Sequence, residues 1–396
     1  MTGSIPTIDL SLLESPEGHA AASRDVLHAM EHVGFLAIKN IPGYDERRLL
    51  EAAKWFFDSP LEDKLKIGKR RFNPKQPNIY KGYFPCQPAA NESKTTSYKE
   101  GLDIGIDVPA ELQHQLPPWP LKHLYEPNLL PQADTPESVA FSKTLSDHLA
   151  VVQRASHAIM SVLAVGLGLP SDYFLPLFEP LPLSTLRLIH YPYRPPAAAD
   201  TSAEAAATEG EPVLHCSEHT DSGFLTILAT FDFKGLQILT GDGRWVDVPP
   251  RPDVLVVNIG DTLAKLSGGR FKATRHRVVD LRQERYSVPF FYEPRYDVDI
   301  SKPFTHRPLQ AEGEASPKSH GGSPPRTLLA VPRMSDHLLA HPQKTPPFPH
   351  LPSEWYGVWL LGKIKEFVEY GDVLETVETE SDGSCELPPA AMMADA

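Results

Sequence analysis

The sequence predicts a mainly β protein with flanking helices, in which a double-stranded β-helix (jelly-roll) core follows a helical N-terminal region and precedes a C-terminal helix. Two observations predict it. Between residues 181 and 295, short apolar runs such as 254–259 and 286–292 are separated by Gly, Asp and Pro, which is the pattern of short strands joined by turns in a barrel or a double-sheet jelly roll. From 136 to 168, apolar residues recur at steps of three and four, which predicts one long helix packed against the sheets.

The elements divide the chain into four predicted regions. An N-terminal region, 4–130, is expected to hold a strand at 5–10, a helix at 18–32, a strand at 35–38, helices at 46–57 and 61–67, and an irregular stretch at 72–131. The core, 131–300, holds the long helix and the strands. An extension, 301–372, ends in a helix at 352–370, and residues 373–396 form an acidic tail that we expect to be disordered.

Composition narrows the class of protein. The 396 residues are 41% hydrophobic and 22% charged, as in ordinary globular proteins. A net charge of −13 argues against a nucleic-acid partner, because phosphate contacts need clustered cations. No apolar run is long enough for a membrane span, and three scattered cysteines imply no disulfide framework. We therefore expect a cytoplasmic protein that acts on a small molecule, with its oligomeric state left open.

One pattern indicates a metal centre. His219 and Asp221 are two residues apart, so in a strand both side chains project from one face. His276 follows 55 residues after Asp221 at the head of a short apolar run. Two imidazoles and one carboxylate are the facial triad of non-haem Fe(II) oxygenases. The same donors with a water also suit Zn(II) in a hydrolase. Cys216, three residues before His219, is expected on the opposite strand face and is not predicted to be a ligand.

A second pattern lies close behind in the sequence. Arg285 and Ser287 are also two residues apart and are expected to share a strand face. A guanidinium with a hydroxyl beside it suits a bound carboxylate. The sequence therefore predicts an acid-binding site next to the metal.

Together with 186–192, 260–261 and 269–271, these segments resemble the Fe(II)- and 2-oxoglutarate-dependent dioxygenases of the isopenicillin N synthase-like family. The resemblance implies a jelly roll, the metal ligands His219, Asp221 and His276, and the cofactors Fe(II), 2-oxoglutarate and O2. It implies that Arg285 and Ser287 bind the far carboxylate of 2-oxoglutarate and that Tyr191 contacts the co-substrate or the substrate. No catalytic residue beyond the metal ligands is implied.

The implied reaction is oxidation of a small organic substrate, by hydroxylation or desaturation, with release of succinate and CO2. Two further alternatives stay open at this point. Isopenicillin N synthase is an Fe(II) oxidase that uses no oxoacid although it keeps the Arg-x-Ser pair, and a non-catalytic module could retain the metal residues. Tyr83, Phe84 and residues 99–101 are candidates for the pocket mouth, and Thr220 and Asn258 for residues that support the ligands.

Overall fold

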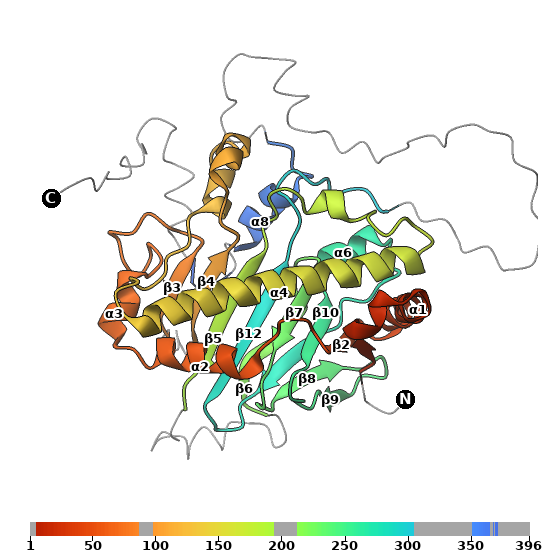
Figure 1. Cartoon of the computed structure of the whole chain (residues 1–396), viewed down its shortest axis with the longest axis horizontal. Helices are drawn as coiled ribbons and strands as arrows, with labels where there is room; N and C mark the ends of the chain where they lie inside the picture. The colour runs from red at the N-terminus through yellow and green to blue at the C-terminus, as the bar shows by residue number, and fades with distance from the viewer. Residues whose placement is uncertain are drawn as a thin grey trace, which may run out of the picture.

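A 31-residue helix, α4 (Pro136–Gly166), lies across one face of a large sheet in the computed structural model (Figure 1). The structure describes residues 5–86, 98–193, 212–304, 351–364, 367, 369 and 370. Thr135 caps α4 through a reciprocal pair of hydrogen bonds with Ser138, and Pro136 occupies its first turn, where a missing N–H costs nothing. The predicted stripe faces the sheet, with Leu145, Val152 and Ile159 fully buried.

The sheets form the predicted jelly roll. Within the described residues the larger sheet has eight strands in the order β1-β2-β10-β7-β12-β5-β4-β3, and the smaller has four in the order β6-β11-β8-β9. β1 and β2 pair in parallel, and the pairs that build the rest of both sheets are antiparallel. The strand bounds are β1 (Thr7–Asp9), β2 (Phe35–Lys39), β3 (Gly82–Phe84), β4 (Glu100–Gly105), β5 (Thr185–Tyr191), β6 (Leu214–His219), β7 (Leu225–Ala229), β8 (Leu236–Leu239), β9 (Trp245–Asp247), β10 (Leu255–Ile259), β11 (His276–Val279) and β12 (Arg285–Tyr292).

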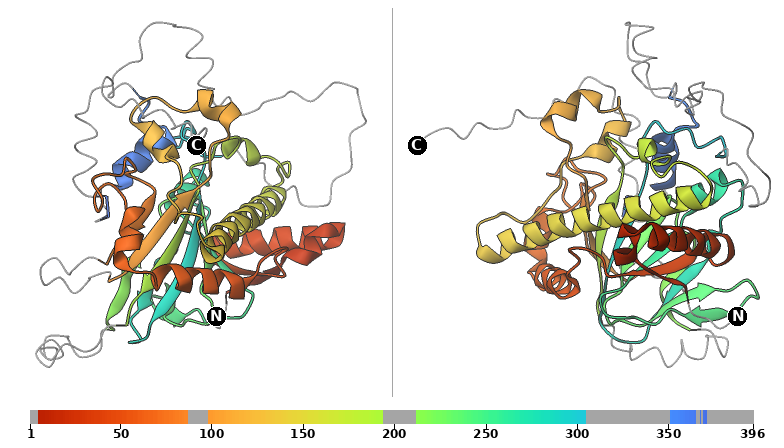
Figure 2. Two further views of the ribbon diagram at one scale, coloured as in Figure 1. Left: turned by 60° about the vertical axis from the view of Figure 1, so that its left-hand side comes forward. Right: turned by 45° about the vertical axis from the view of Figure 1, so that its right-hand side comes forward.

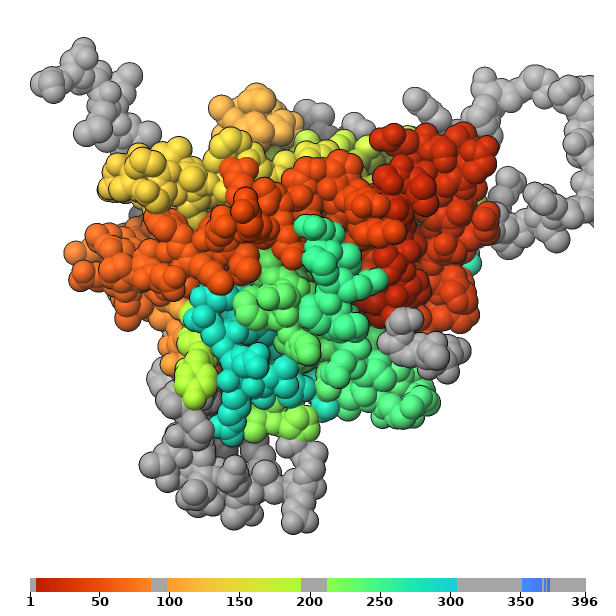
Figure 3. Space-filling view, turned by 60° about the horizontal axis from the view of Figure 1, so that its bottom comes forward, coloured from red at the N-terminus to blue at the C-terminus, as the bar shows by residue number. Residues whose placement is uncertain are grey.

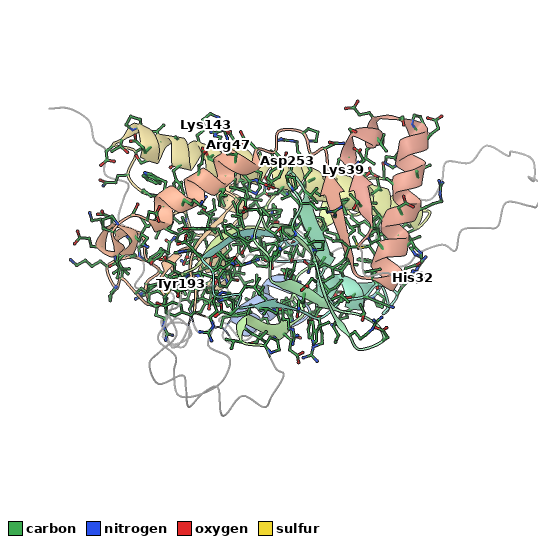
Figure 4. All side chains as sticks on the ribbon, turned by 90° about the horizontal axis from the view of Figure 1, so that it is seen from below. His32, Lys39, Arg47, Lys143, Tyr193 and Asp253 are labelled. Atoms are coloured by element: carbon green, nitrogen blue, oxygen red, sulfur yellow. The ribbon has the colours of Figure 1, made fainter. Side chains whose placement is uncertain are left out.

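Three layers result, with helices on the outside of the larger sheet and the smaller sheet on its inside. The helices are α1 (Pro16–His32), α2 (Glu46–Phe57), α3 (Leu61–Lys66), α4, α6 (Asp261–Leu266) and α8 (Tyr356–Ile364), with short 3-10 turns at Leu10–Glu14, Ala110–Gln115, Leu121–Tyr125 and Leu175–Leu177. Figure 2 shows α1 and α4 side by side on the outer face, and Figure 4 shows Arg47 and Lys143 on the outer edge of this helical layer. From below, residues 212–300 form much of the surface beside the N-terminal region (Figure 3).

The two faces of the larger sheet carry different chemistry. On β12, Tyr286, Val288, Phe290 and Tyr292 belong to the hydrophobic core under the helices. The intervening residues Arg285 and Ser287 face the opposite way, toward the smaller sheet, because successive strand residues alternate between faces. A second, smaller core between the sheets contains Phe35, Ile238 and Val278. The predicted site residues therefore lie between the two sheets.

The expectation of an irregular stretch at 72–131 is wrong in part, because β3 and β4 lie within it and extend the larger sheet. β4 is buried throughout, yet it carries Glu100 and Asp103. Asp103 accepts from Lys69 Nζ at 2.7 Å and from Arg187 Nε at 2.6 Å. Leu102 and Ile104 do alternate along β4, but the charged residues and glycines around them keep the apolar pattern too short to stand out in the sequence.

The helix expected at 352–370 is present as the shorter α8. α4 has the length and hydropathy of a membrane-spanning helix, but 56% of that window is buried inside the protein. β1 to β4 come from the predicted N-terminal region and share a sheet with the core strands. The region boundaries remain predictions, and the acidic tail at 373–396 lies outside the described residues.

Candidate metal centre and acid-binding site

Three side chains converge at the end of the smaller sheet. His219 is the last residue of β6 and pairs in register with His276, the first residue of β11. Asp221 follows two residues after His219. Asp221 Oδ1 lies 3.7 Å from Nε2 of His219 and 3.7 Å from Nε2 of His276, and the three ligand atoms lie within 4.8 Å of one another. Residues 55 positions apart in sequence therefore present three donors to one point, as predicted.

The other polar atom of each ligand is already engaged. Nδ1 of His219 lies 2.7 Å from the Ser217 carbonyl, and Nδ1 of His276 lies 3.2 Å from the Thr274 carbonyl. A donor proton on Nδ1 leaves Nε2 as a free lone pair, which is the state that binds a metal. The chain thus fixes both the ring orientation and the tautomer that a metal needs.

Asp221 divides its two oxygens. Oδ2 accepts hydrogen bonds from Thr226 Oγ1 at 2.5 Å and from Asn258 Nδ2 at 2.7 Å, while Oδ1 faces the imidazoles. Burial acts to raise the pKa of Asp221, but the two histidines and these hydrogen bonds outweigh it and hold the pKa below its usual value. The group is therefore an ionised carboxylate with one oxygen available.

Of the supporting residues considered from sequence, Asn258 contacts a ligand and Thr220 does not, since the Thr220 hydroxyl donates to Asp261 Oδ2 at 2.9 Å. Thr226 was not considered in the sequence analysis. Its position on β7, next to Asn258 on β10, becomes informative only when the strand register is known.

The expectation that Cys216 lies on the opposite strand face is wrong. Cys216 pairs with Val278 and His219 with His276, so three steps on β6 match two on β11, which is a β-bulge. The bulge returns Cys216 to the side of His219, and its Sγ lies 3.8 Å from His219 Nδ1. That nitrogen is on the far side of the ring from Nε2. Cys216 is accordingly not part of the converging donor set.

The predicted acid-binding residues are buried beside the metal centre. Arg285 and Ser287 are 4% and 2% exposed, and Arg285 Nη1 donates to Ser287 Oγ at 3.1 Å. Arg285 pairs with Tyr191 across β12 and β5, and its guanidinium carbon lies 5.0 Å from the Tyr191 ring centroid. Arg285 and Ser287, selected by their spacing, and Tyr191, selected by the resemblance, therefore lie together in the structure.

No carboxylate of the described residues compensates the buried positive charge of Arg285. Its Nε has no hydrogen-bond partner, and no carboxylate forms an ion pair with it, in the described part of the chain. Burial lowers the pKa of Arg285, which reflects the cost of holding an unpaired cation away from water. A ligand carboxylate at this point would satisfy the free N–H and offset the charge, so the residues fit a bound dicarboxylate such as 2-oxoglutarate.

Similarity to known proteins agrees with this chemistry. Residues 184–294 match the 2OG-Fe(II) oxygenase superfamily, and residues 5–133 match the family described as non-haem dioxygenase in morphine synthesis N-terminal. The chain is 30% identical to clavatol oxidase claD of Penicillium crustosum over 78% of this chain and 90% of that protein. It is 31% identical to the 2-oxoglutarate-Fe(II) type oxidoreductase hxnY of Emericella nidulans, over 74% of this chain and 80% of that protein.

A solved structure shows the same fold. The Neurospora crassa T7H protein in complex with alpha-KG and thymine is 27% identical to this chain, with a TM-score of 0.60 over 75% of this chain and 88% of that chain. These relatives favour the 2-oxoglutarate-dependent oxygenase over the oxidase, the zinc hydrolase and the non-catalytic module. The chain belongs to the 2OG-Fe(II) oxygenase superfamily and is a non-haem Fe(II)- and 2-oxoglutarate-dependent dioxygenase.

Proposed function

We propose that His219, Asp221 and His276 bind the Fe(II), and that Arg285, Ser287 and Tyr191 bind 2-oxoglutarate. The observation that carries this assignment is the buried Arg285, which has a free N–H and no counter-ion among the described residues. It is close enough to interact with Cys216, whose Sγ lies 3.8 Å from Nδ1 of His219, one of the three converging donors. Fe(II) with 2-oxoglutarate and O2 supplies the oxidising chemistry, in which 2-oxoglutarate yields succinate and CO2 while the substrate is hydroxylated or desaturated.

The chain's own residues then have three tasks. Ser217 and Thr274 hold the two imidazoles through their carbonyls, and Thr226 and Asn258 hold the carboxylate. Arg285 and Ser287 orient the dicarboxylate by its far end, with the Tyr191 ring against the guanidinium. Burial of Arg285 and Ser287 excludes water from the ion pair between Arg285 and the bound carboxylate, which strengthens the binding of the co-substrate.

The proposed substrate is a small organic molecule. Two of the similar structures are described as holding such molecules: T7H with thymine, and JOX2 with 2OG, Fe and JA, the latter 26% identical with a TM-score of 0.53. The net charge of −13 supports a substrate that is not a nucleic acid. We also propose that the protein acts in the cytoplasm without a membrane partner, which cell fractionation would test.

The test is anaerobic loading with Fe(II) and 2-oxoglutarate, followed by oxygen and a metabolite panel, with succinate, oxygen and metal content measured. We expect one Fe(II) per chain and succinate release that a true substrate stimulates. Substrate-dependent oxygen uptake without any need for 2-oxoglutarate would instead identify an oxidase. Retention of zinc together with hydrolysis of a panel compound would instead indicate a zinc hydrolase. Failure to bind any metal would indicate a non-catalytic module.

A further inference from the structure

Three buried polar atoms near the metal centre lack a hydrogen-bond partner of good geometry in the portion of the chain described here. They are Arg285 Nε, Glu293 Oε2 and Tyr356 Oη. Buried polar groups in folded proteins are nearly always paired, so each exception needs a reason. The 2-oxoglutarate carboxylate accounts for Arg285. Glu293 and Tyr356 lie close enough to interact with each other, but no other described residue pairs with Glu293 Oε2 or Tyr356 Oη.

Both groups lie against the turn that carries the metal ligand Asp221. Glu293 directly follows β12, and Tyr356 opens α8. A Cβ placed on Gly223, two residues after Asp221, would lie 3.1 Å from Glu293 Oε1 and 3.4 Å from Tyr356 Oη. The missing side chain at Gly223 therefore leaves the carboxyl and the hydroxyl room beside this turn. The negative charge of Asp221 also acts on Glu293, which agrees with that proximity.

Glu293 is held in place but is not paired as a structural ion. Its backbone N–H donates to Ser184 Oγ at 3.1 Å, and Ser184 Oγ donates to its carbonyl at 3.2 Å. Glu293 is 7% exposed, and no lysine or arginine among the described residues forms an ion pair with it. By contrast, the buried Glu100 is paired with Lys64 at 2.9 Å. A fixed, buried carboxyl with no cation is costly unless something else binds it.

The protonation state of Glu293 widens what it can bind. Burial raises the pKa of this carboxyl to about 8, which favours the neutral acid. A neutral carboxylic acid both donates and accepts a hydrogen bond. The Tyr356 hydroxyl beside it can do the same.

We propose that Glu293 and Tyr356 form a substrate-binding subsite that takes a hydrogen-bonding N–H or O–H group of the small substrate and holds it beside the iron. The inference rests on the proposed function and narrows its substrate class to molecules with an amide, imide, amine or hydroxyl group near the oxidised carbon. Glu293 is a specificity-determining residue here and takes no part in the bond changes.

The first test compares matched compounds and variants. Amides, imides and alcohols that stimulate succinate release are compared with their N- or O-methylated counterparts, in wild type, Glu293→Gln, Glu293→Leu and Tyr356→Phe. We expect Glu293→Leu to lower substrate kcat/KM by about 10- to 100-fold, with a smaller loss in Glu293→Gln. The KM for 2-oxoglutarate and the Fe(II) content should not change. The matched control is Glu354→Gln, an exposed glutamate two residues before Tyr356.

The second test needs no known substrate. Crystals of the protein loaded with Mn(II) and 2-oxoglutarate are soaked in molar acetamide or in N,N-dimethylacetamide. We expect the acetamide nitrogen or oxygen at hydrogen-bond distance from Glu293 in wild type and its loss in Glu293→Leu, with lower occupancy of the dimethyl compound, which can accept a hydrogen bond but cannot donate one.

Two results would overturn the subsite. One is a soaked wild-type crystal in which no acetamide is bound and the Glu293 side chain bonds only to Tyr356. The other is a Glu293→Leu enzyme with an altered melting temperature but an unchanged substrate kcat/KM. That result would show that Glu293 and Tyr356 only stabilise the packing of α8. Failure of the proposed function is distinguishable from either, because it would appear as crystals without bound Mn(II) and 2-oxoglutarate or as absent 2-oxoglutarate turnover in wild type.

Discussion

Replacing Arg285 by Gln should weaken 2-oxoglutarate binding strongly and leave the empty protein as stable as before, or more stable. The side chain is 4% exposed and its charge is unpaired among the described residues. Removing one partner of a buried, hydrogen-bonded charge pair costs about 3–5 kcal/mol, which is on the order of 10²- to 10⁴-fold in Kd. In the ligand-free protein no such ion pair exists, so the same substitution removes a desolvation cost and only two weaker attractions, the hydrogen bond to Ser287 and the contact with the Tyr191 ring.

The two effects have opposite signs, which makes the experiment decisive. Isothermal titration of 2-oxoglutarate into anaerobic Fe(II)-loaded protein gives the Kd, and thermal unfolding without ligand gives the stability. Ser287→Ala should lose only about 1 kcal/mol, since one hydroxyl bond is removed. Arg244→Gln is the control, because Arg244 is exposed and pairs with Asp242 at 2.7 Å on the surface. An unchanged Kd in Arg285→Gln, or an equal loss in Arg244→Gln, would refute the reasoning.

Three further predictions concern the metal centre and the helical layer. The double variant His219→Ala, Asp221→Ala should keep its circular dichroism but not its Fe(II), and one retained iron per chain by metal analysis would contradict the ligand assignment. Asn258→Ala should lower Fe(II) affinity by about 10- to 100-fold in chelator competition, whereas Thr220→Ala, whose hydroxyl bonds elsewhere, should not. Burial lowers the pKa of His148 from 6.5 to about 4, so the folded protein keeps this group neutral while the unfolded chain gains a proton below pH 6.5. Stability should therefore fall between pH 6.5 and 4, by at most about 3 kcal/mol, and urea unfolding of His148→Leu at pH 7 and pH 5 should lack that part of the loss. Equal pH dependence in both proteins would exclude this cause.

Much of the site could be predicted because several of its residues are only two positions apart in the sequence. His219 and Asp221, and likewise Arg285 and Ser287, share a strand face through a separation of two residues, which depends on strand geometry alone. The long helix was predictable for a similar reason, since its apolar stripe repeats over many turns. The fold also has to bring His276 to His219 and Asp221. The resemblance of the sequence to a known family implied that these three residues meet.

The errors arise where residues distant in sequence determine the local structure. Cys216 was expected on the wrong face because one extra residue in β6 reverses the alternation, and a bulge leaves no mark in a stretch of this composition. β4 was missed because Asp103 and Glu100 make a buried strand look polar until their cationic partners are known. Glu293 and Tyr356 meet only through tertiary packing, so neither stood out in the sequence.

The unequal use of the two Asp221 oxygens sets the denticity of this ligand. Because Thr226 and Asn258 occupy Oδ2, the carboxylate is held for one-point attachment and cannot swing to chelate an ion with both oxygens. One-point attachment by Asp221, together with the two imidazoles, would leave room on the ion for a chelating oxoacid and O2. Two neutral side chains that do not touch the ion would thus help to decide whether the co-substrate and oxygen can be accommodated together.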